Sequence, residues 1–157
     1  MNYRLTMYIS SHLTILLTLA QYSITSALPP LRARDTAELY IFANCISTKT
    51  HASYAAIFWY YPDFLPDYPE PQLTAYINNH TSIQYAGKTT KVTHPFTLTA
   101  AIPRNATAAK PGTLVSTNAS AGSFAGLMAV FRGSGEVFYR PEKRVACLEE
   151  YYMQDVG

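Results

Sequence analysis

The chain has 157 residues, of which 48% are hydrophobic, 13% aromatic and only 14% charged, and its formal net charge is +2. This length is enough for one domain with a modest hydrophobic core. The small net charge indicates no basic field that could attract nucleic acid, so we expect no nucleic-acid partner.

Residues 1–27 have the order of a secretory signal peptide. A short start that carries Arg4 precedes an apolar run over 13–20, and small residues follow at Thr25 and Ala27. The run is shorter than the ~20 residues that a membrane-spanning helix needs, which disfavours the alternative of an uncleaved membrane anchor. We predict cleavage after Ala27 and an extracellular, secreted protein with no membrane association after cleavage.

A leader or short pro-segment is expected over 28–36, followed by a single β domain over 37–157. Removal of the signal peptide removes Arg4 and no acid, which lowers the formal net charge from +2 to +1. We expect this mature chain to be a monomer. Few charges remain to keep it in solution, so hydroxyl and amide side chains, and glycans, must contribute.

Two cysteines and three sequons agree with secretion. In an oxidising compartment Cys45 and Cys147 are expected to form one disulfide, although two buried free thiols remain an alternative. Asn79, Asn105 and Asn118 each begin an N-x-[ST] triplet in loop-like sequence and are predicted N-glycosylation sites. The bridge would join the first strand of the domain to the last.

The first predicted strands are rich in apolar and aromatic residues. Over 37–45 both alternating sets are largely apolar, which predicts a central strand covered on both faces. Residues 53–61 predict a second, aromatic strand. Residues 73–77 and 82–86 flank the sequence NNHT, which predicts a hairpin with the Asn79 sequon at its tip.

The middle of the chain alternates less strongly. Residues 88–94 predict a half-exposed strand, and after Pro95 a second strand is expected over 96–102. The stretch 103–121 has little apolar density, so we predict a long glycosylated loop that holds one short strand at 113–116.

Two elements are expected at the C-terminal end. Residues 124–131 and 136–139 predict the two arms of a hairpin, with the glycine-rich sequence at 133–135 as its turn. Residues 143–154 predict the last strand, with a short helix from Leu148 as the alternative. Short strands with turn signals between them indicate an all-β fold, a small antiparallel sandwich or barrel.

The sequence offers little support for catalysis or for a metal. The histidines of the mature chain, His51, His80 and His94, show no metal-ligand spacing, and we expect no metal and no cofactor. The adjacent Glu149 and Glu150 would point to opposite faces of a strand, so they could not flank one glycosidic bond.

One catalytic alternative remains open. Glu136, Phe138 and Arg140 would share one face of a strand, and His51 or His94 could supply a second proton-transfer group, as in a small ribonuclease-like hydrolase. A simple ion pair explains the same spacing, and we favour it. We therefore expect no enzyme.

The stretch FWYYPDFLPDYPEPQ, residues 58–72, is the candidate binding loop. Tyr61, Phe64 and Tyr68 offer the flat faces and hydroxyls that sugars and proteins recognise. Its prolines would hold the loop in extended or turn conformations. The alternative is that these rings pack onto the end of the domain. Its acids lack the spacing of a calcium loop.

The chain looks like the small secreted proteins of filamentous ascomycete fungi, often called effector candidates. The resemblance rests on the signal peptide, LPPLRARD, ELYIFANC, the aromatic strand ending in YY, and a late cysteine before YY. It implies fungal secretion and a role facing a host or a cell wall. We expect a non-enzymatic β domain that binds a host protein or a cell-wall polysaccharide. A purely structural wall protein remains an alternative.

Overall fold

The computed structural model describes residues 38–61, 70–122 and 126–156, and these ranges form β-strands and one short 3-10 helix, η1 (Arg104–Ala108). The strands are β1 (Leu39–Ser47), β2 (Ser53–Tyr60), β3 (Leu73–Asn78), β4 (Lys88–Val92), β5 (Leu98–Ile102), β6 (Leu114–Ser116), β7 (Ala119–Ala121), β8 (Met128–Arg132), β9 (Val137–Tyr139) and β10 (Val145–Asp155). The predicted all-β class is confirmed. Within the described ranges, no helix has the length and apolar character needed to cross a membrane. The predicted signal peptide and leader lie outside these ranges.

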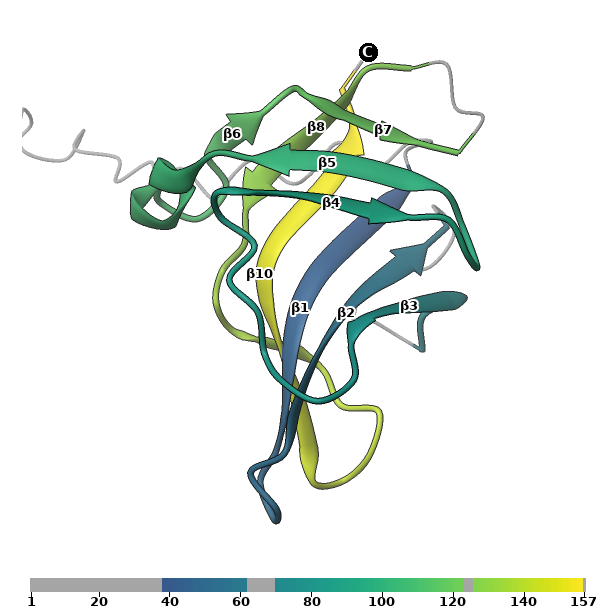
Figure 1. Ribbon diagram of the computed structural model, residues 1–157, viewed down its shortest axis with the longest axis vertical. Helices are drawn as coiled ribbons and strands as arrows, with labels where there is room; N and C mark the ends of the chain where they lie inside the picture. The colour runs from purple at the N-terminus through teal and green to yellow at the C-terminus, as the bar shows by residue number, and fades with distance from the viewer. Residues whose placement is uncertain (1–37, 62–69, 123–125, 157) are drawn as a thin grey trace, which may run out of the picture. The chain divides into compact units, whose positions relative to one another are not determined.

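The strands form two antiparallel sheets. The large sheet has the order β3-β2-β1-β10-β8-β6, with β9 also paired to β10, and the small sheet has the order β4-β5-β7. Figure 1 shows β4, β5 and β7 crossing the upper part of the large sheet, while β1, β2 and β10 continue below them. The fold is therefore a sandwich, one of the two predicted architectures.

The main hydrophobic core lies between the two sheets. The large sheet contributes Phe42, Ile57 and Met153, and the small sheet contributes Leu98 and Ile102, all nearly inaccessible to solvent. On β5 every second residue is buried, which is the pattern of a strand with one face on the core and one on solvent. Burial of these side chains is the main force that holds the sheets together.

The large sheet has a second hydrophobic cluster on its outer face, the face turned away from the small sheet. Ile41, Phe58 and Tyr152 belong to this cluster, and Phe131 and Phe138 pack against it. Seven consecutive residues of β1 are buried as a result. The prediction of a central strand covered on both faces is confirmed.

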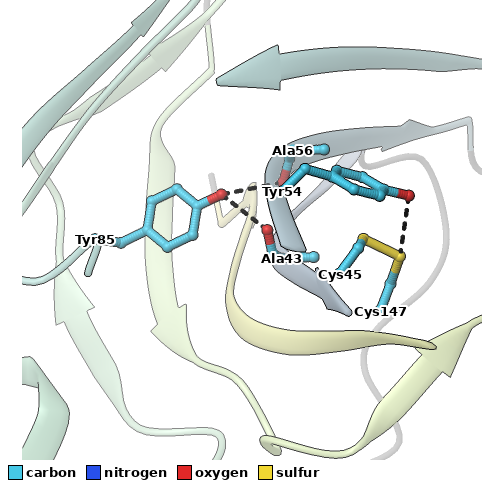
Figure 2. Close-up of a disulfide and its surroundings, with 6 residues drawn as sticks. All are labelled: Ala43, Cys45, Tyr54, Ala56, Tyr85 and Cys147. Atoms are coloured by element: carbon cyan, nitrogen blue, oxygen red, sulfur yellow. Dashed lines mark hydrogen bonds between the residues drawn. A yellow bond between two sulfur atoms is a disulfide. The ribbon is translucent and has the colours of Figure 1, made fainter. Parts of the chain in front are cut away.

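The predicted disulfide joins β1 to β10. Cys45 and Cys147 are direct partners in these neighbouring antiparallel strands, both are inaccessible to solvent, and they form the bridge drawn in Figure 2. The bridge spans a sequence separation of 102 residues. On the chain-entropy model a loop of that length contributes up to about 4.7 kcal/mol of stability.

The predicted hairpin between 73–77 and 82–86 is wrong. β3 pairs with β2 only, and the segment after it crosses to the small sheet. The amide of Asn44 explains why this segment does not turn back along β3: its Nδ2 donates to Ile83 O and its Oδ1 accepts from Ile83 N, each at 3.0 Å. These hydrogen bonds take the place of the backbone bonds that the segment would have formed with β3 in a hairpin.

Tyr85 is a second anchor of the same segment. Its ring packs edge-on against Phe42, with the ring centroids 5.5 Å apart. Its hydroxyl lies 3.0 Å from Ala43 O and 3.2 Å from Ala56 O, so one proton is shared between two strand carbonyls (Figure 2). The connection between the sheets is therefore attached to the centre of the large sheet.

The predicted hairpin between 124–131 and 136–139 is also wrong. β8 and β9 do not pair with each other but follow one another along the same edge of β10. Gly133 lies directly against β10, since a Cβ there would meet the carbonyl oxygen of Glu149 at 2.5 Å. The glycine serves this close approach, and Gly135, with φ of 73°, lets the chain rejoin the edge.

Two further predictions need adjustment. The stretch 103–121 is not a plain loop, because it holds η1, β6 and β7. β6 confirms the short strand expected near 113–116, whereas β7 was missed. The last element is a strand throughout, so the alternative of a helix from Leu148 is wrong.

Candidate functional site

A row of side chains crosses the outer face of the large sheet. Tyr54 is the direct partner of Cys45, Cys45 of Cys147, and Cys147 of Tyr139. Residues directly opposite one another on paired strands share a face and lie close together. The disulfide therefore occupies the middle of the row, with a tyrosine on each side, and the hydroxyl of Tyr54 lies 3.8 Å from the Cys147 sulfur (Figure 2).

Tyr76 on the edge strand β3 extends this row. It is the partner of Ala56, and its ring centroid lies 5.6 Å from that of Tyr54 with the planes tilted by 55°. At 62% exposure it is the most exposed large hydrophobic side chain of the described residues. We call Tyr54, Tyr76 and Tyr139 the tyrosine surface.

Buried aromatic rings support the tyrosine surface from below. Phe58 is only 2% exposed, and its ring makes edge-to-face contacts with Phe138 and Tyr139, each with centroids 5.5 Å apart. Edge-to-face pairs add to the stability that burial alone provides. These contacts support Tyr139, and the disulfide lies between Tyr139 and Tyr54 in the row.

The hydroxyls of Tyr54 and Tyr139 stay protonated because their pKa values are raised. Burial, with smaller contributions from Tyr76, Tyr139 and Glu142, raises the pKa of Tyr54 to about 12. Burial first, and then the charge of Glu70, raises the pKa of Tyr139. At ordinary pH each neutral hydroxyl can donate and accept hydrogen bonds, and the two nearby carboxylates are further acceptors.

The predicted binding residues are only partly described. Tyr61 is 50% exposed at the end of β2, and its ring contacts Trp59 at 6.1 Å. Its backbone N–H donates to Gln72 Oε1 at 3.0 Å. It makes no ring contact with the tyrosine surface. Phe64 and Tyr68 lie outside the described residues, so their direction stays open.

The residues of the catalytic alternative lie at the two ends of β9 and in three connections. β9 contains only Val137–Tyr139, so Glu136 and Arg140 flank the strand and both are exposed. In the described ranges no hydrogen bond or ion pair joins either side chain to a histidine. Nor do these ranges contain a group of three or more side chains able to hold a metal ion.

The histidines lie in three separate connections. His51 is in the turn between β1 and β2 with φ of 58°, and His94 precedes a cis proline between β4 and β5. His80 follows β3, where Asn78 Oδ1 accepts the backbone N–H groups of His80 and Thr81 at 2.8 and 3.0 Å. All three side chains are exposed.

The adjacent acids of β10 lie at an irregularity in the pairing with β1. Glu149 is only 3% exposed, and its Oε2 accepts the backbone N–H and the hydroxyl of Ser134 at 3.1 and 2.9 Å. Glu150 lies 3.4 Å from the guanidinium of Arg132, which stacks over the ring of Tyr151 at 5.0 Å. These acids hold the interrupted edge of β10 together.

The predicted glycosylation sites are accessible. Asn79 is exposed in the turn after β3, Asn105 in η1, and Asn118 between β6 and β7. Exposure is what a glycan requires, and their occupancy stays a prediction.

Sequence reasoning missed the tyrosine surface. Tyr54 and Tyr76 lie in strands that were predicted, and Tyr139 lies in a predicted arm. Their types and alternation were visible, but their meeting depends on which strands pair and in which register. No protein-family model, curated protein or solved structure matches this chain, so its site is inferred from its own residues.

Proposed function

We propose that this protein is a secreted, non-enzymatic binding module whose tyrosine surface holds a cell-wall polysaccharide. The observation that carries the proposal is the exposure of Tyr76, at 62%, beside Tyr54 and on a face stiffened by the disulfide. A sugar ring presents an apolar face that packs on aromatic rings, and hydroxyls that bond to phenol and carboxylate groups.

Rigidity supports the same proposal. The tyrosine surface rests on buried Phe58 and on two bridged central strands, so little side-chain freedom remains to be lost on binding. A preformed surface binds more tightly than a mobile one with the same contacts. The carboxylates of Glu70 and Glu142 near the tyrosines would orient a neutral sugar through hydrogen bonds.

Binding to insoluble chitin, β-glucan and cellulose tests the proposal. The full chain and its Tyr76→Ala variant are mixed with each polysaccharide, and the free protein is measured. Loss of one stacking ring should weaken binding roughly 3- to 10-fold. Tyr76→Phe keeps the ring and removes the hydroxyl, so it distinguishes the contribution of the ring to binding from that of the hydroxyl.

Leu127→Ala is the matched control, because Leu127 is 54% exposed and lies outside the tyrosine surface. Tyr61→Ala tests the other exposed ring, from the predicted binding loop. If Tyr76→Ala binds as well as Leu127→Ala to every polysaccharide, the tyrosine surface is not the glycan site. If Tyr61→Ala loses binding and Tyr76→Ala does not, the binding site belongs to the predicted loop over 58–72.

A host protein is the competing partner, since exposed tyrosines also anchor protein interfaces. The ribonuclease-like hydrolase using Glu136, Arg140 and a histidine is the alternative from another class. RNA cleavage by the parent chain, lost in Glu136→Gln, would favour that hydrolase. In the described ranges no hydrogen bond or ion pair joins Glu136 or Arg140 to a histidine, so that hydrolase gains no support from the contacts.

A further inference from the structure

The charges of this chain are segregated along the sequence and between the sheets. Residues 71–135 contain no Asp or Glu. The same stretch carries the cations Lys88, Lys91, Arg104, Lys110 and Arg132. It includes all of the small sheet, η1 and β6. A net charge of only +2 therefore conceals a stretch without acids that contains the whole small sheet.

Among the residues that the structure describes, Arg132 is the one of these cations with an acidic partner. It is paired with Glu150, whereas Lys88 and Arg104 form no ion pair in the described ranges. Both side chains are exposed. Because these two charges form no ion pair within the described residues, they are available to an external anion.

Lys88 and Arg104 line the same groove. The groove lies where β4 begins and β5 ends, and it has a volume of about 460 Å³. Its lining also includes Thr89, Ser116 and Asn118, which supply two hydroxyls and an amide. No carboxylate and no aromatic ring is part of this lining. The groove is shallow and largely open to solvent.

Gly87 positions the guanidinium of this groove. The stem of Arg104 passes so close to Gly87 that an added Cβ would lie 2.7 Å from Arg104 Cγ. The φ of Gly87 is +80°, a conformation that side-chain-bearing residues rarely adopt. The N–H of Gly87 also donates to Ile102 O at 2.7 Å, which ties this turn to the end of β5.

We propose that this groove binds the carboxylate of an anionic polysaccharide, with Lys88 and Arg104 as its cationic contacts. Arg104 can hold a carboxylate through two parallel hydrogen bonds, and Lys88 adds a point charge. The hydroxyls of Thr89 and Ser116 would bond to the sugar hydroxyls. This site is separate from the tyrosine surface and does not depend on it.

A sugar acid fits the groove better than a nucleic acid does. Proteins that bind single-stranded nucleic acid stack bases on aromatic side chains, and this groove has none. Duplex binding relies on contacts to many phosphates, whereas this groove holds two cations. A single sugar acid would bind this groove weakly. In a polymer, a neighbouring sugar unit can bind the groove when one unit leaves it, which raises the apparent affinity.

The Asn118 sequon affects the design of the test. Asn118 is part of the lining, so a glycan on it would lie at the groove, and substitution of Asn118 would change the lining itself. Ser120→Ala removes the sequon while leaving the groove intact, since Ser120 lies on β7 outside the lining. Every measurement is therefore made on the full chain that carries Ser120→Ala.

Polygalacturonate is the probe, with neutral dextran and single-stranded DNA as comparators. We expect binding to polygalacturonate that weakens as salt rises. The double variant Lys88→Gln/Arg104→Gln should weaken it by at least about fivefold. The charge-matched control Lys49→Gln/Lys143→Gln changes two exposed lysines outside the groove and should bind like the parent.

Three outcomes would overturn the proposal. The first is an equal loss of affinity for polygalacturonate in the two double variants, and the second is no binding to polygalacturonate. The third is binding to single-stranded DNA with the same affinity as to polygalacturonate, weakened to the same extent in Lys88→Gln/Arg104→Gln. Tyr76→Ala, measured in parallel, should leave polygalacturonate binding unchanged. Failure of this groove is thus distinguishable from failure of the tyrosine surface.

Discussion

The outward-facing surfaces of the two sheets are built differently. On the large sheet that face carries a second hydrophobic cluster, a disulfide and the exposed Tyr76. On the small sheet it carries exposed Thr89, Lys91 and Ser120, which alternate with buried positions. A sheet packed on both faces needs nearly continuous apolar strands, whereas a sheet packed on one face needs only alternation.

The two surfaces also differ in charge. Glu70 and Glu142 lie near the tyrosine surface, and the small sheet belongs to a stretch without any acid. One molecule therefore offers hydrogen-bond acceptors with aromatic rings on one side and unpaired cations on the other. The comparison shows that the local distribution of charge, and not the near-neutral net charge, describes the surface that a ligand contacts.

The strongest test of the large sheet removes its covalent link. Replacing Cys45 and Cys147 together with alanine should lower the free energy of unfolding by roughly 2–5 kcal/mol, because the unfolded chain regains its freedom. Urea denaturation measures the change, and the parent chain unfolded with a reducing agent should agree with the variant. An unchanged midpoint would show that buried aromatic packing alone holds the outer face.

Glycine substitutions compare how tightly the two sheets are packed. Gly133→Ala pushes a Cβ into the backbone of Glu149 at 2.5 Å, so we expect a loss of about 1–3 kcal/mol. Gly87→Ala meets a flexible side chain instead, and strain at its positive φ should cost about 1–2 kcal/mol. Gly112→Ala, with φ of +78° and nothing within 4 Å, isolates that strain. Equal losses at Gly133 and Gly112 would contradict the close approach.

The Tyr85 anchor between the sheets gives a pH-dependent test. Burial raises the pKa of Tyr85 above its ordinary value of 10.0, so its ionisation is disfavoured in the folded state. Its contribution is fully present below about pH 10 and is lost as pH rises above it. Tyr85→Phe should cost about 0.5–1.5 kcal/mol at neutral pH. It should also flatten the fall of stability between about pH 9 and 11.

Urea denaturation across that pH range measures the slope for the parent and for Tyr85→Phe. Tyr61→Phe, on an exposed ring, is the control. Identical slopes in the parent and in Tyr85→Phe would mean that other groups govern alkaline unfolding.

The smallest expected effect on stability is that of Tyr76→Ala. Because Tyr76 is 62% exposed on an edge strand, we expect a change within about 0.5 kcal/mol. Thermal unfolding of Tyr76→Ala beside Leu127→Ala checks this. A large loss would show that the tyrosine surface serves packing and would weaken its assignment as a binding surface.

Part of this fold could be predicted because its signals are local. The apolar runs at 37–45 and 53–61 predicted buried strands, and the structure has β1 and β2 there. The two wrong hairpins had convincing turn sequences. In the first, Ile83 bonds to Asn44 and Tyr85 bonds to Ala43, which lie 39 and 42 residues earlier in the chain. In the second, Gly133 lies against the backbone of β10 and keeps the chain on the same edge of that strand. The turn sequences do not reveal either of these long-range contacts.

The candidate site was harder to predict than the fold. The sequence indicated an aromatic binding loop at 58–72, most of which lies outside the described residues. The tyrosine surface instead combines side chains from β2, β3 and β9. The cationic groove combines the start of β4, the end of β5 and the β6–β7 connection. The absence of acids over 71–135 was a signal in the sequence that could have pointed to this groove.

The sequence by itself determined the strand composition, the covered central strand and the single possible disulfide. Those properties follow from side-chain alternation and from a count of two cysteines, which need no knowledge of distant partners. Only the tertiary structure decided that β8 and β9 share one edge, that Tyr54, Tyr76 and Tyr139 lie on one face, and that Lys88 and Arg104 meet. Strand pairing is a competition among segments far apart in the chain, and buried side chains and close backbone contacts select its outcome.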